Sequence, residues 1–132
     1  MKKIGVIGTR KRNIRTDYQL TSDAFFDIYE DGDWIVSGRC KKGADAFAEK
    51  ISEDYGIPIL LFPPKKCSDR NEHIKSLFDR NKLIAKYSTV IIACLMNPHE
   101  SVDDILRRQS GGTEHTLRHF RKYHPEGEII VV

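Results

Sequence analysis

Apolar and polar residues follow one another in blocks along this chain, and the blocks repeat a strand-then-helix order. Short apolar runs, typical of strands buried on both faces, occupy residues 3–8, 34–36, 57–62, 90–95 and 128–132. Between most of them, apolar residues recur at three- and four-residue spacing, which predicts helices. The order βαβαβαβαβ predicts an α/β fold, a Rossmann-like three-layer sandwich with a parallel sheet of about five strands.

Local signals indicate where the first two helices begin and end. Asp17 is placed to cap the first, whose apolar stripe includes Tyr18 and Phe25. The clearest stripe runs from Ala44 to Tyr55, and the following Gly56 is a natural residue to end that helix.

The second half of the chain carries two further helical patterns and one long connection. Asp69 and Glu72 have the spacing of a capping box. They open a helix whose core-side stripe contains Ile74, Leu77, Phe78, Asn81, Ile84 and Ala85. Residues 96–110 are a long polar segment, which predicts a binding loop, a lid or a loop that contains a short helix around 105–108. The last helix is expected to start near 113 and to end near 122–123.

Length and composition indicate one globular domain over residues 1–132. Apolar residues make up 39% of the chain and charged residues 31%, which is too polar for a membrane span. Met1-Lys2-Lys3 leads into a strand instead of a signal-peptide core. We therefore expect a cytoplasmic protein that does not associate with a membrane.

The cysteines, the histidines and the net charge limit which kinds of ligand and metal site we expect. Three widely spaced cysteines favour neither a disulfide framework nor a zinc site. His115 and His119 are four residues apart, but no third ligand accompanies them, so we expect a solvated helix face, no metal and no cofactor. A net charge of +3 suits an anionic ligand without requiring nucleic acid.

Three glycine-containing segments follow predicted strands, at 8–10, 37–45 and 110–116. Because the carboxyl ends of parallel strands lie at one edge of a sheet, these segments are expected to meet there. Glycines let backbone N–H groups approach an anion, and the amino end of the last helix adds partial positive charge. The convergence predicts a site for a phosphorylated or nucleotide-like ligand, with Thr113 and Thr116 as hydroxyl donors.

Several polar side chains have more than one interpretation. Arg10 is the better candidate for a ligand contact, whereas Lys11 and Arg12 are interpreted as a solvated basic turn. Asn81 falls on the core side of its helix and needs partners, either structural or from a ligand. Asp45 is expected either to contact a ribose or bound water, or to accept N–H groups at the start of its own helix.

The motifs together resemble the SLOG superfamily over essentially the whole chain. They are Gly-Val-Ile-Gly-Thr-Arg at 5–10, Ser-Gly-Arg-Cys-Lys-Lys-Gly-Ala-Asp at 37–45, Arg-Asn at 80–81 and Gly-Gly-Thr at 111–113. That superfamily includes the LOG phosphoribohydrolases, the DNA-processing protein DprA and the small YspA-like proteins, the branch that this chain resembles most. The resemblance implies a Rossmann-like domain that binds nucleotides or nucleotide-derived ligands, and it suggests a homodimer.

Carried onto this sequence, the resemblance implies a set of ligand-binding residues. They are Gly8, Thr9, Arg10, Ser37, Gly38, Gly43, Asp45, Arg80, Asn81, Gly111, Gly112, Thr113 and Thr116. In the LOG enzymes a Glu three residues after the Thr works with an Arg on the N-glycosidic bond, but here that position is Thr116. A hydroxyl cannot replace a carboxylate in stabilising an oxocarbenium-like centre.

Three functions follow, in order of preference. The first is a sensor or processing protein that binds a nucleotide-derived ligand. The second is a LOG-like hydrolase of nucleoside monophosphates, with Arg80 and either Glu114 or Asp45 as the catalytic groups. A solvent-facing Glu114 at the helix start is the simpler expectation. The third, a DprA-like single-strand DNA binder, ranks last because 19 acidic residues offset the basic ones.

Overall fold

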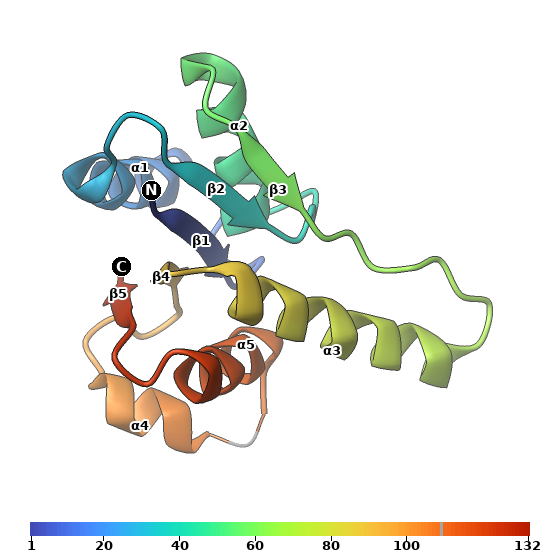
Figure 1. Cartoon of the computed structure of the whole chain (residues 1–132). Coiled ribbons are helices and arrows are strands. Elements are labelled where there is room, and N and C mark those ends of the chain that lie inside the picture. The colour runs from blue at the N-terminus through green and yellow to red at the C-terminus, as the bar shows by residue number, and fades with distance from the viewer. Residues whose placement is uncertain (109) are drawn as a thin grey trace.

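The computed structural model describes residues 1–108 and 110–132 and has an α/β architecture (Figure 1). In chain order the elements are β1 (Lys3–Gly8), α1 (Arg15–Ile28), β2 (Trp34–Ser37), α2 (Ala44–Tyr55), β3 (Ile59–Leu61), α3 (Arg70–Tyr87), β4 (Val90–Cys94), α4 (Val102–Arg107), α5 (Gly112–Tyr123) and β5 (Glu128–Val131). Among the described residues the sheet has five strands in the order β3-β2-β1-β4-β5, all parallel. The predicted Rossmann-like three-layer sandwich is confirmed.

Each face of the sheet is covered by a different set of helices (Figure 1). Ile4 and Val6 of β1 belong to a buried cluster that includes residues of α1 and α2, whereas Ile7 belongs to a cluster with residues of α3, α4 and α5. Neighbouring residues of one strand point to opposite faces, so a continuous apolar run is buried on both sides. Within the described ranges, no helix is both long and apolar enough to span a membrane.

Most predicted boundaries hold, and two are wrong for identifiable reasons. Helix α1 begins at Arg15, and Asp17 accepts the backbone N–H of Ile14 (3.3 Å) from inside the first turn instead of capping it from outside. Strand β3 starts later than expected because the N–H of Ile57 is donated to the carbonyl of Ser52 at the end of α2 (3.1 Å). Three other predictions are confirmed: the two ends of α2, the Asp69 cap of α3, and a short helix inside 96–110.

The first half of α3 does not pack on the sheet as its stripe predicted. Ile74 and Phe78 are 38% and 42% exposed, and the buried residues of α3 are Asn81, Ile84 and Ala85, all in its second half. An 18-residue helix is about 27 Å long, whereas a strand of six residues spans about 20 Å. The amino-terminal half of α3 therefore extends past the carboxyl ends of the strands (Figure 1).

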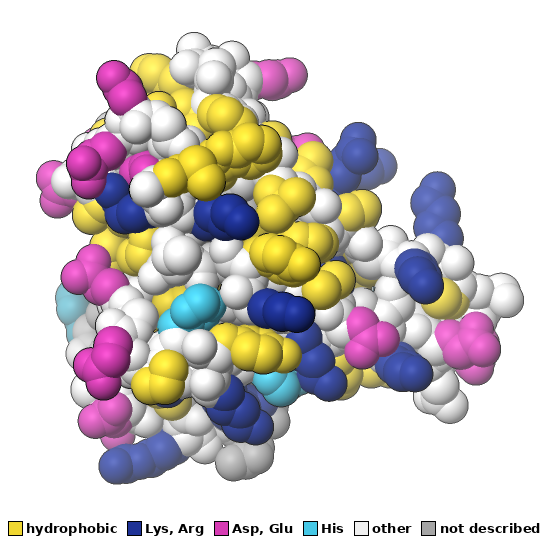
Figure 2. All heavy atoms as spheres, in the orientation of Figure 1, with side chains coloured by type: hydrophobic (Ala, Val, Ile, Leu, Met, Phe, Trp, Pro, Cys, Tyr) yellow, Lys and Arg dark blue, Asp and Glu magenta, His cyan; other side chains and the backbone are white. Residues whose placement is uncertain are grey.

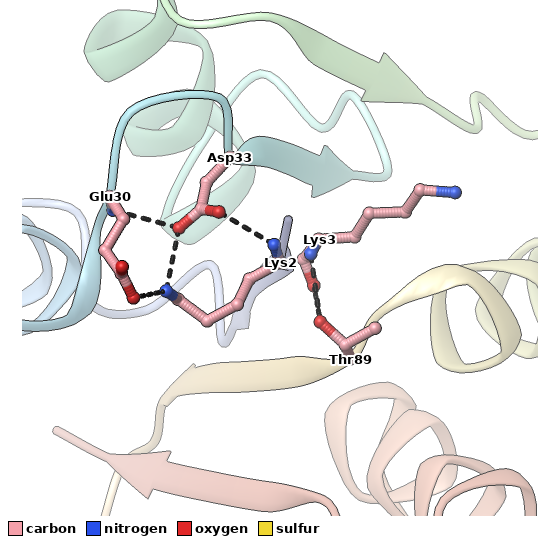
Figure 3. Close-up of polar contacts among 5 residues, drawn as sticks. All are labelled: Lys2, Lys3, Glu30, Asp33 and Thr89. Atoms are coloured by element: carbon pink, nitrogen blue, oxygen red, sulfur yellow. Dashed lines mark hydrogen bonds and ion pairs between the residues drawn. The ribbon is translucent and has the colours of Figure 1, made fainter.

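A polar cluster fastens the opposite, amino-terminal edge of the sheet (Figure 3). The buried Asp33 carboxylate, 3% exposed, accepts the N–H groups of Lys2 (2.7 Å) and Glu30 (2.9 Å) and pairs with the Lys2 ammonium (3.0 Å). Beside it, the Lys3 N–H is donated to the Thr89 hydroxyl (2.9 Å), which joins β1 to the start of β4. Burial alone would raise the pKa of Asp33, but these hydrogen bonds and the Lys2 charge outweigh it and lower the pKa below 3.8.

We predict that Asp33→Asn lowers the free energy of unfolding by about 1–3 kcal/mol at pH 7, because an amide cannot accept all three donors. The folded-state pKa of Asp33 is depressed, so its contribution is present above pH 3.8 and is lost as the pH falls through the folded-state pKa. Urea unfolding at several pH values should show the difference from wild type shrinking below pH 4. The exposed neighbour Asp31, changed to Asn, is the control, and an equal effect there would contradict the prediction.

Candidate functional site

A cavity of about 740 Å³ opens at the carboxyl edge of the sheet. Its wall is made by the segments that follow β1, β2, β3 and β4, by one side of α3, and by the amino end of α5. Strand order reverses beside β1, the place where parallel α/β sheets bind ligands. Most of the residues predicted for the site line this cavity: Gly8, Thr9, Arg10, Asp45, Arg80, Asn81, Gly111, Gly112, Thr113, Glu114 and Thr116.

Ser37, Gly38 and Gly43, also predicted for the site, do not line the cavity, and the two glycines allow other groups to approach closely. A side chain at Gly38 would come within 2.3 Å of the Arg80 guanidinium. Gly43 has φ 74° and touches the turn after β1, so a Cβ there would lie 2.7 Å from the carbonyl oxygen of Thr9. The buried Ser37 hydroxyl has no hydrogen-bond partner among the described residues.

Arg80 and Asn81 connect three segments of the cavity wall. The Arg80 guanidinium donates to the carbonyl of Gly38 (2.7 Å) and to the Asn81 side-chain oxygen (3.1 Å). The Asn81 amide in turn donates to the carbonyl of Gly112 (3.3 Å). The oxygen and the nitrogen of the Asn81 amide thus each have a partner within the protein, which is the structural role left open for it; because Asn81 also lines the cavity, its contact with a ligand stays a prediction.

Asp45 holds the loop between β2 and α2. Its carboxylate accepts the N–H of Cys40 (2.9 Å) and lies 3.9 Å from the Arg80 guanidinium. One alternative expected Asp45 to accept N–H groups at the start of its own helix. The observed donor lies instead in the loop that precedes the helix. Burial raises the pKa of Asp45 above its ordinary value, and the Cys40 hydrogen bond and the Arg80 charge oppose this effect.

The amino end of α5 presents backbone N–H groups to the cavity, whereas the Thr116 hydroxyl is hydrogen-bonded within the helix. Gly111 precedes the helix with φ 99°, a conformation that favours glycine, and Gly112 and Thr113 form its first turn. The Thr116 hydroxyl, expected to face a ligand, is donated to the carbonyl of Gly112 (3.0 Å) and is buried. Backbone N–H groups and Thr113 are thus the donors left at this helix end.

Glu114 does not face solvent, contrary to the simpler expectation. Its side chain is 16% exposed, lies 3.6 Å from the Arg108 guanidinium, and lines the cavity. The carboxylate folds back over Gly111, where an added Cβ would be 2.7 Å from its oxygens. Arg108 also bonds Glu100, so the connection between β4 and α5 supplies the cation that draws Glu114 inward.

The charge of the cavity wall is mainly positive. Among the described lining residues, five carry a positive charge and two a carboxylate: Arg10, Lys11, Arg39, Lys42 and Arg80 against Asp45 and Glu114. Lys11 is exposed, as its interpretation in a solvated turn required, and it also lines the cavity. A wall of this composition raises the local concentration of anions.

Arg12, the other residue of the expected solvated turn, is mostly buried. Its side chain is 14% exposed, pairs with Asp17 (3.0 Å), and donates to the carbonyls of Leu95 (2.8 Å) and Val132. It therefore joins the β1–α1 loop to the ends of β4 and β5 and contributes no charge to the cavity.

Six apolar residues also line the cavity, and sequence patterns did not identify them as part of it: Pro64, Ile74, Leu77, Phe78, Leu95 and Met96. The signal for Met96 was its position directly after the strand beside β1, where ligands bind in such sheets. The residues of α3 gave no such signal, because periodicity indicates a common face but not what that face contacts.

His115 and His119 are both half-buried, so the predicted solvated face holds only in part. The His115 ring lies 4.5 Å from the Phe78 ring and 4.6 Å from the His119 ring, and its Nδ1 is buried without a partner among the described residues. Burial, then the charges of His119, Arg118, Lys82 and Lys122, lower the pKa of His115 to about 4. Within residues 1–108 and 110–132, no group of three or more His, Cys, Asp or Glu could hold a metal ion.

We predict that the His115 imidazole titrates near pH 4 in an NMR experiment. Because the unfolded-state value is 6.5, protonation favours unfolding, and stability should fall as the pH drops from about 6.5 to about 4. Phe78→Ala, which uncovers the ring, should raise the His115 pKa toward 6.5. Titration of wild-type His115 near 6.5 would show that the ring is solvated after all.

Arg39 is the one described non-glycine residue with positive φ, 58°. This conformation costs an L-residue roughly 1–2 kcal/mol. We therefore predict that Arg39→Gly is more stable than Arg39→Ala by about 1 kcal/mol in urea unfolding, since neither variant retains the side chain and only glycine relieves the backbone. At neighbouring Lys41, which is not in that conformation, the order of the two variants should be reversed. The same order at both positions would contradict the prediction.

Comparisons of the chain with known protein families, with curated proteins and with solved structures find no match. The resemblance to the SLOG superfamily therefore depends on the motifs at 5–10, 37–45, 80–81 and 111–113. Segments from all four of these motifs contribute residues to one cavity wall.

Proposed function

We propose that this chain binds a nucleotide or a nucleotide-derived phosphorylated ligand in the cavity at the carboxyl edge of its sheet, as a sensor or a nucleotide-processing protein of the SLOG type. The observation that carries the proposal is the composition of one wall. Glycine-bounded turns, the start of α5 and five described cations border the same cavity. Its volume of about 740 Å³ lies within the usual range for small-molecule sites.

The phosphate is assigned to the start of α5. Gly112 is exposed to the cavity, and its backbone together with Thr113 offers hydrogen-bond donors where the helix dipole is positive. The Glu114 carboxylate lies over neighbouring Gly111, and its ion pair with Arg108 offsets its repulsion of a phosphate. Arg10 lies on the wall without an ion-pair partner among the residues that the structure describes, so it is available to a second phosphate oxygen. Charge-assisted hydrogen bonds of this kind are stronger than neutral ones.

The base is assigned to the apolar side of the cavity. Ile74, Leu77 and Phe78 lie on the part of α3 that extends past the sheet, and their exposed apolar surface faces the cavity. A nucleobase is a flat, weakly polar group, and its stacking on an aromatic ring is worth roughly 1–3 kcal/mol in single-strand binders. The cavity therefore combines a cationic side for phosphate with an apolar side for a base.

A second candidate, N-glycosidic hydrolysis of a nucleoside monophosphate, is favoured by the position of Glu114. The carboxylate lines the cavity beside its ion-pair partner Arg108, and Arg80 lines the same cavity. In this reaction water adds to the anomeric carbon while the base leaves with a proton, and Glu114 would polarise that water. Thr116 does not take part, because its hydroxyl is donated to Gly112.

Nucleic acid is a weaker candidate, because the basic side chains are dispersed. On the face shown in Figure 2, Lys and Arg side chains lie among Asp and Glu side chains. A single-strand binder is expected to carry a continuous basic groove with aromatic residues along it. A small phosphorylated ligand, which the cytosol would supply, requires only the cavity.

The proposal predicts that adenosine and guanosine nucleotides raise the melting temperature of the protein. A ligand at a hundredfold excess over its Kd stabilises the fold by about 2.7 kcal/mol, which corresponds to a rise of several degrees for a chain of this size. Inorganic phosphate alone should give a smaller shift. The absence of any shift at millimolar nucleotide would contradict the proposal.

Gly112→Ala is the sharpest variant for this test. A Cβ at Gly112 would lie 3.8 Å from the nearest atom, the Asn81 amide nitrogen, so the fold accommodates it, yet the methyl group obstructs the phosphate at the start of α5. Affinity should fall at least about tenfold with an unchanged melting temperature of the free protein. Arg10→Gln should also weaken binding, whereas Arg15→Gln, which changes an exposed arginine outside the cavity, should not.

Chromatography of the same mixtures distinguishes binding alone from N-glycosidic hydrolysis. Release of free base that disappears in Glu114→Gln indicates hydrolysis.

A further inference from the structure

We infer that the ligand of this cavity carries at least two phosphoryl groups, one at the start of α5 and a second in an adjoining basic hollow. The inference rests on the proposed function and specifies its ligand class. It excludes a nucleoside monophosphate as the preferred ligand. The shared chemistry is a second phosphoryl group, on either the same or another hydroxyl of the nucleotide.

The basic hollow is lined by Arg10, Lys11, Cys40, Lys41 and Lys42 and has a volume of about 480 Å³. Four of these five described residues are cations, and none is acidic. All of them except Lys41 also line the main cavity, so one ligand can occupy both spaces.

The cations of the hollow are held together by the backbone of the two loops that carry them. The Gly43 N–H is donated to the Asn13 side chain (2.7 Å), and Gly43 itself touches Thr9. The Cys40 N–H is fixed by Asp45 (2.9 Å). The loop after β1 and the loop after β2 are thus fastened to each other. Their positive charges are held close together and repel one another, and a bound anion would offset that repulsion.

Nearby carboxylates are engaged with other partners. Asp17 pairs with Arg12, which points away from the hollow toward the ends of β4 and β5. Asp45 accepts the Cys40 N–H and lies beside Arg80. Within the described residues, Arg10, Lys11, Lys41 and Lys42 form no ion pair with any carboxylate, so their charge is available to a ligand.

The anion in the hollow is distinct from the one at α5. Gly111, Gly112 and Thr113 line the main cavity but not the hollow, whereas Lys41 lines the hollow but not the main cavity. These residues also belong to different connections, after β4 and after β2. A single phosphate held at the start of α5 and contacted by Arg10 would leave Lys41 of the hollow without an anion.

Isothermal titration of the full chain at constant ionic strength tests this inference with AMP, ADP and adenosine 3′,5′-bisphosphate. At least one of the doubly phosphorylated ligands should bind about tenfold more tightly than AMP, the gain expected from one additional set of charge-assisted hydrogen bonds. Preference for ADP would indicate adjacent phosphates, and preference for the bisphosphate would indicate phosphates on two hydroxyls.

The variant Lys41→Gln/Lys42→Gln should reduce this preference to about threefold or less. Its matched control is Lys65→Gln/Lys66→Gln, which removes the same charge from two exposed lysines outside both spaces and should keep the full preference. Melting temperatures of the free variants show whether both remain folded.

The possible failures are distinguishable. If AMP binds and the doubly phosphorylated ligands bind no more tightly, the inference is overturned and the proposed function stands. A preference that persists unchanged in the Lys41/Lys42 variant also overturns it, because the second group would then be held elsewhere. If none of the three nucleotides binds, the proposed function fails and the inference fails with it.

Discussion

The burial of a parallel sheet on both faces is the constraint from which the rest of this structure follows. Crossovers between parallel strands are right-handed, so the helices that follow β1 and β2 cover one face and those that follow β3 and β4 cover the other. The chain therefore leaves β1 toward one face and β4, its neighbour, toward the other. An opening at the carboxyl ends of these two strands is a consequence of the topology, and the cavity lies there.

Glycines and side-chain hydrogen bonds determine how closely the loops approach one another around that opening. Gly43 approaches the carbonyl of Thr9, and Gly38 leaves room for the Arg80 guanidinium. Arg80 and Asn81 then link α3 to the loop after β2 and to the start of α5. Residues that looked like ligand contacts thus serve first to fix the cavity wall, which is a requirement for binding a small anion without a large ordering cost.

Charge is distributed unequally between the two edges of the sheet. At the amino edge, Asp33 is fully paired with Lys2 and backbone N–H groups, and this pairing stabilises the fold. At the carboxyl edge, Arg12 is paired with Asp17. The four cations of the hollow, Arg10, Lys11, Lys41 and Lys42, have no such partner among the described residues. Pairing stabilises one edge, and the lack of pairing makes the other suitable for an anionic ligand.

The order of strands and helices was predictable from the sequence, because apolar spacing reports which faces are buried. The sequence also placed glycine-bounded segments directly after the strands. It therefore anticipated the glycine-containing part of the cavity wall, including Gly8, Arg10 and Gly112, but not the apolar residues that line the rest. The projection of α3, the mostly buried position of Arg12 beside an exposed Lys11, and the inward turn of Glu114 and His115 became visible only in the folded chain. Arg12 and His115 take their orientations from partners distant in sequence, Leu95 and Phe78, and Glu114 takes its orientation from Arg108 in the preceding loop; periodicity and local spacing encode none of these contacts.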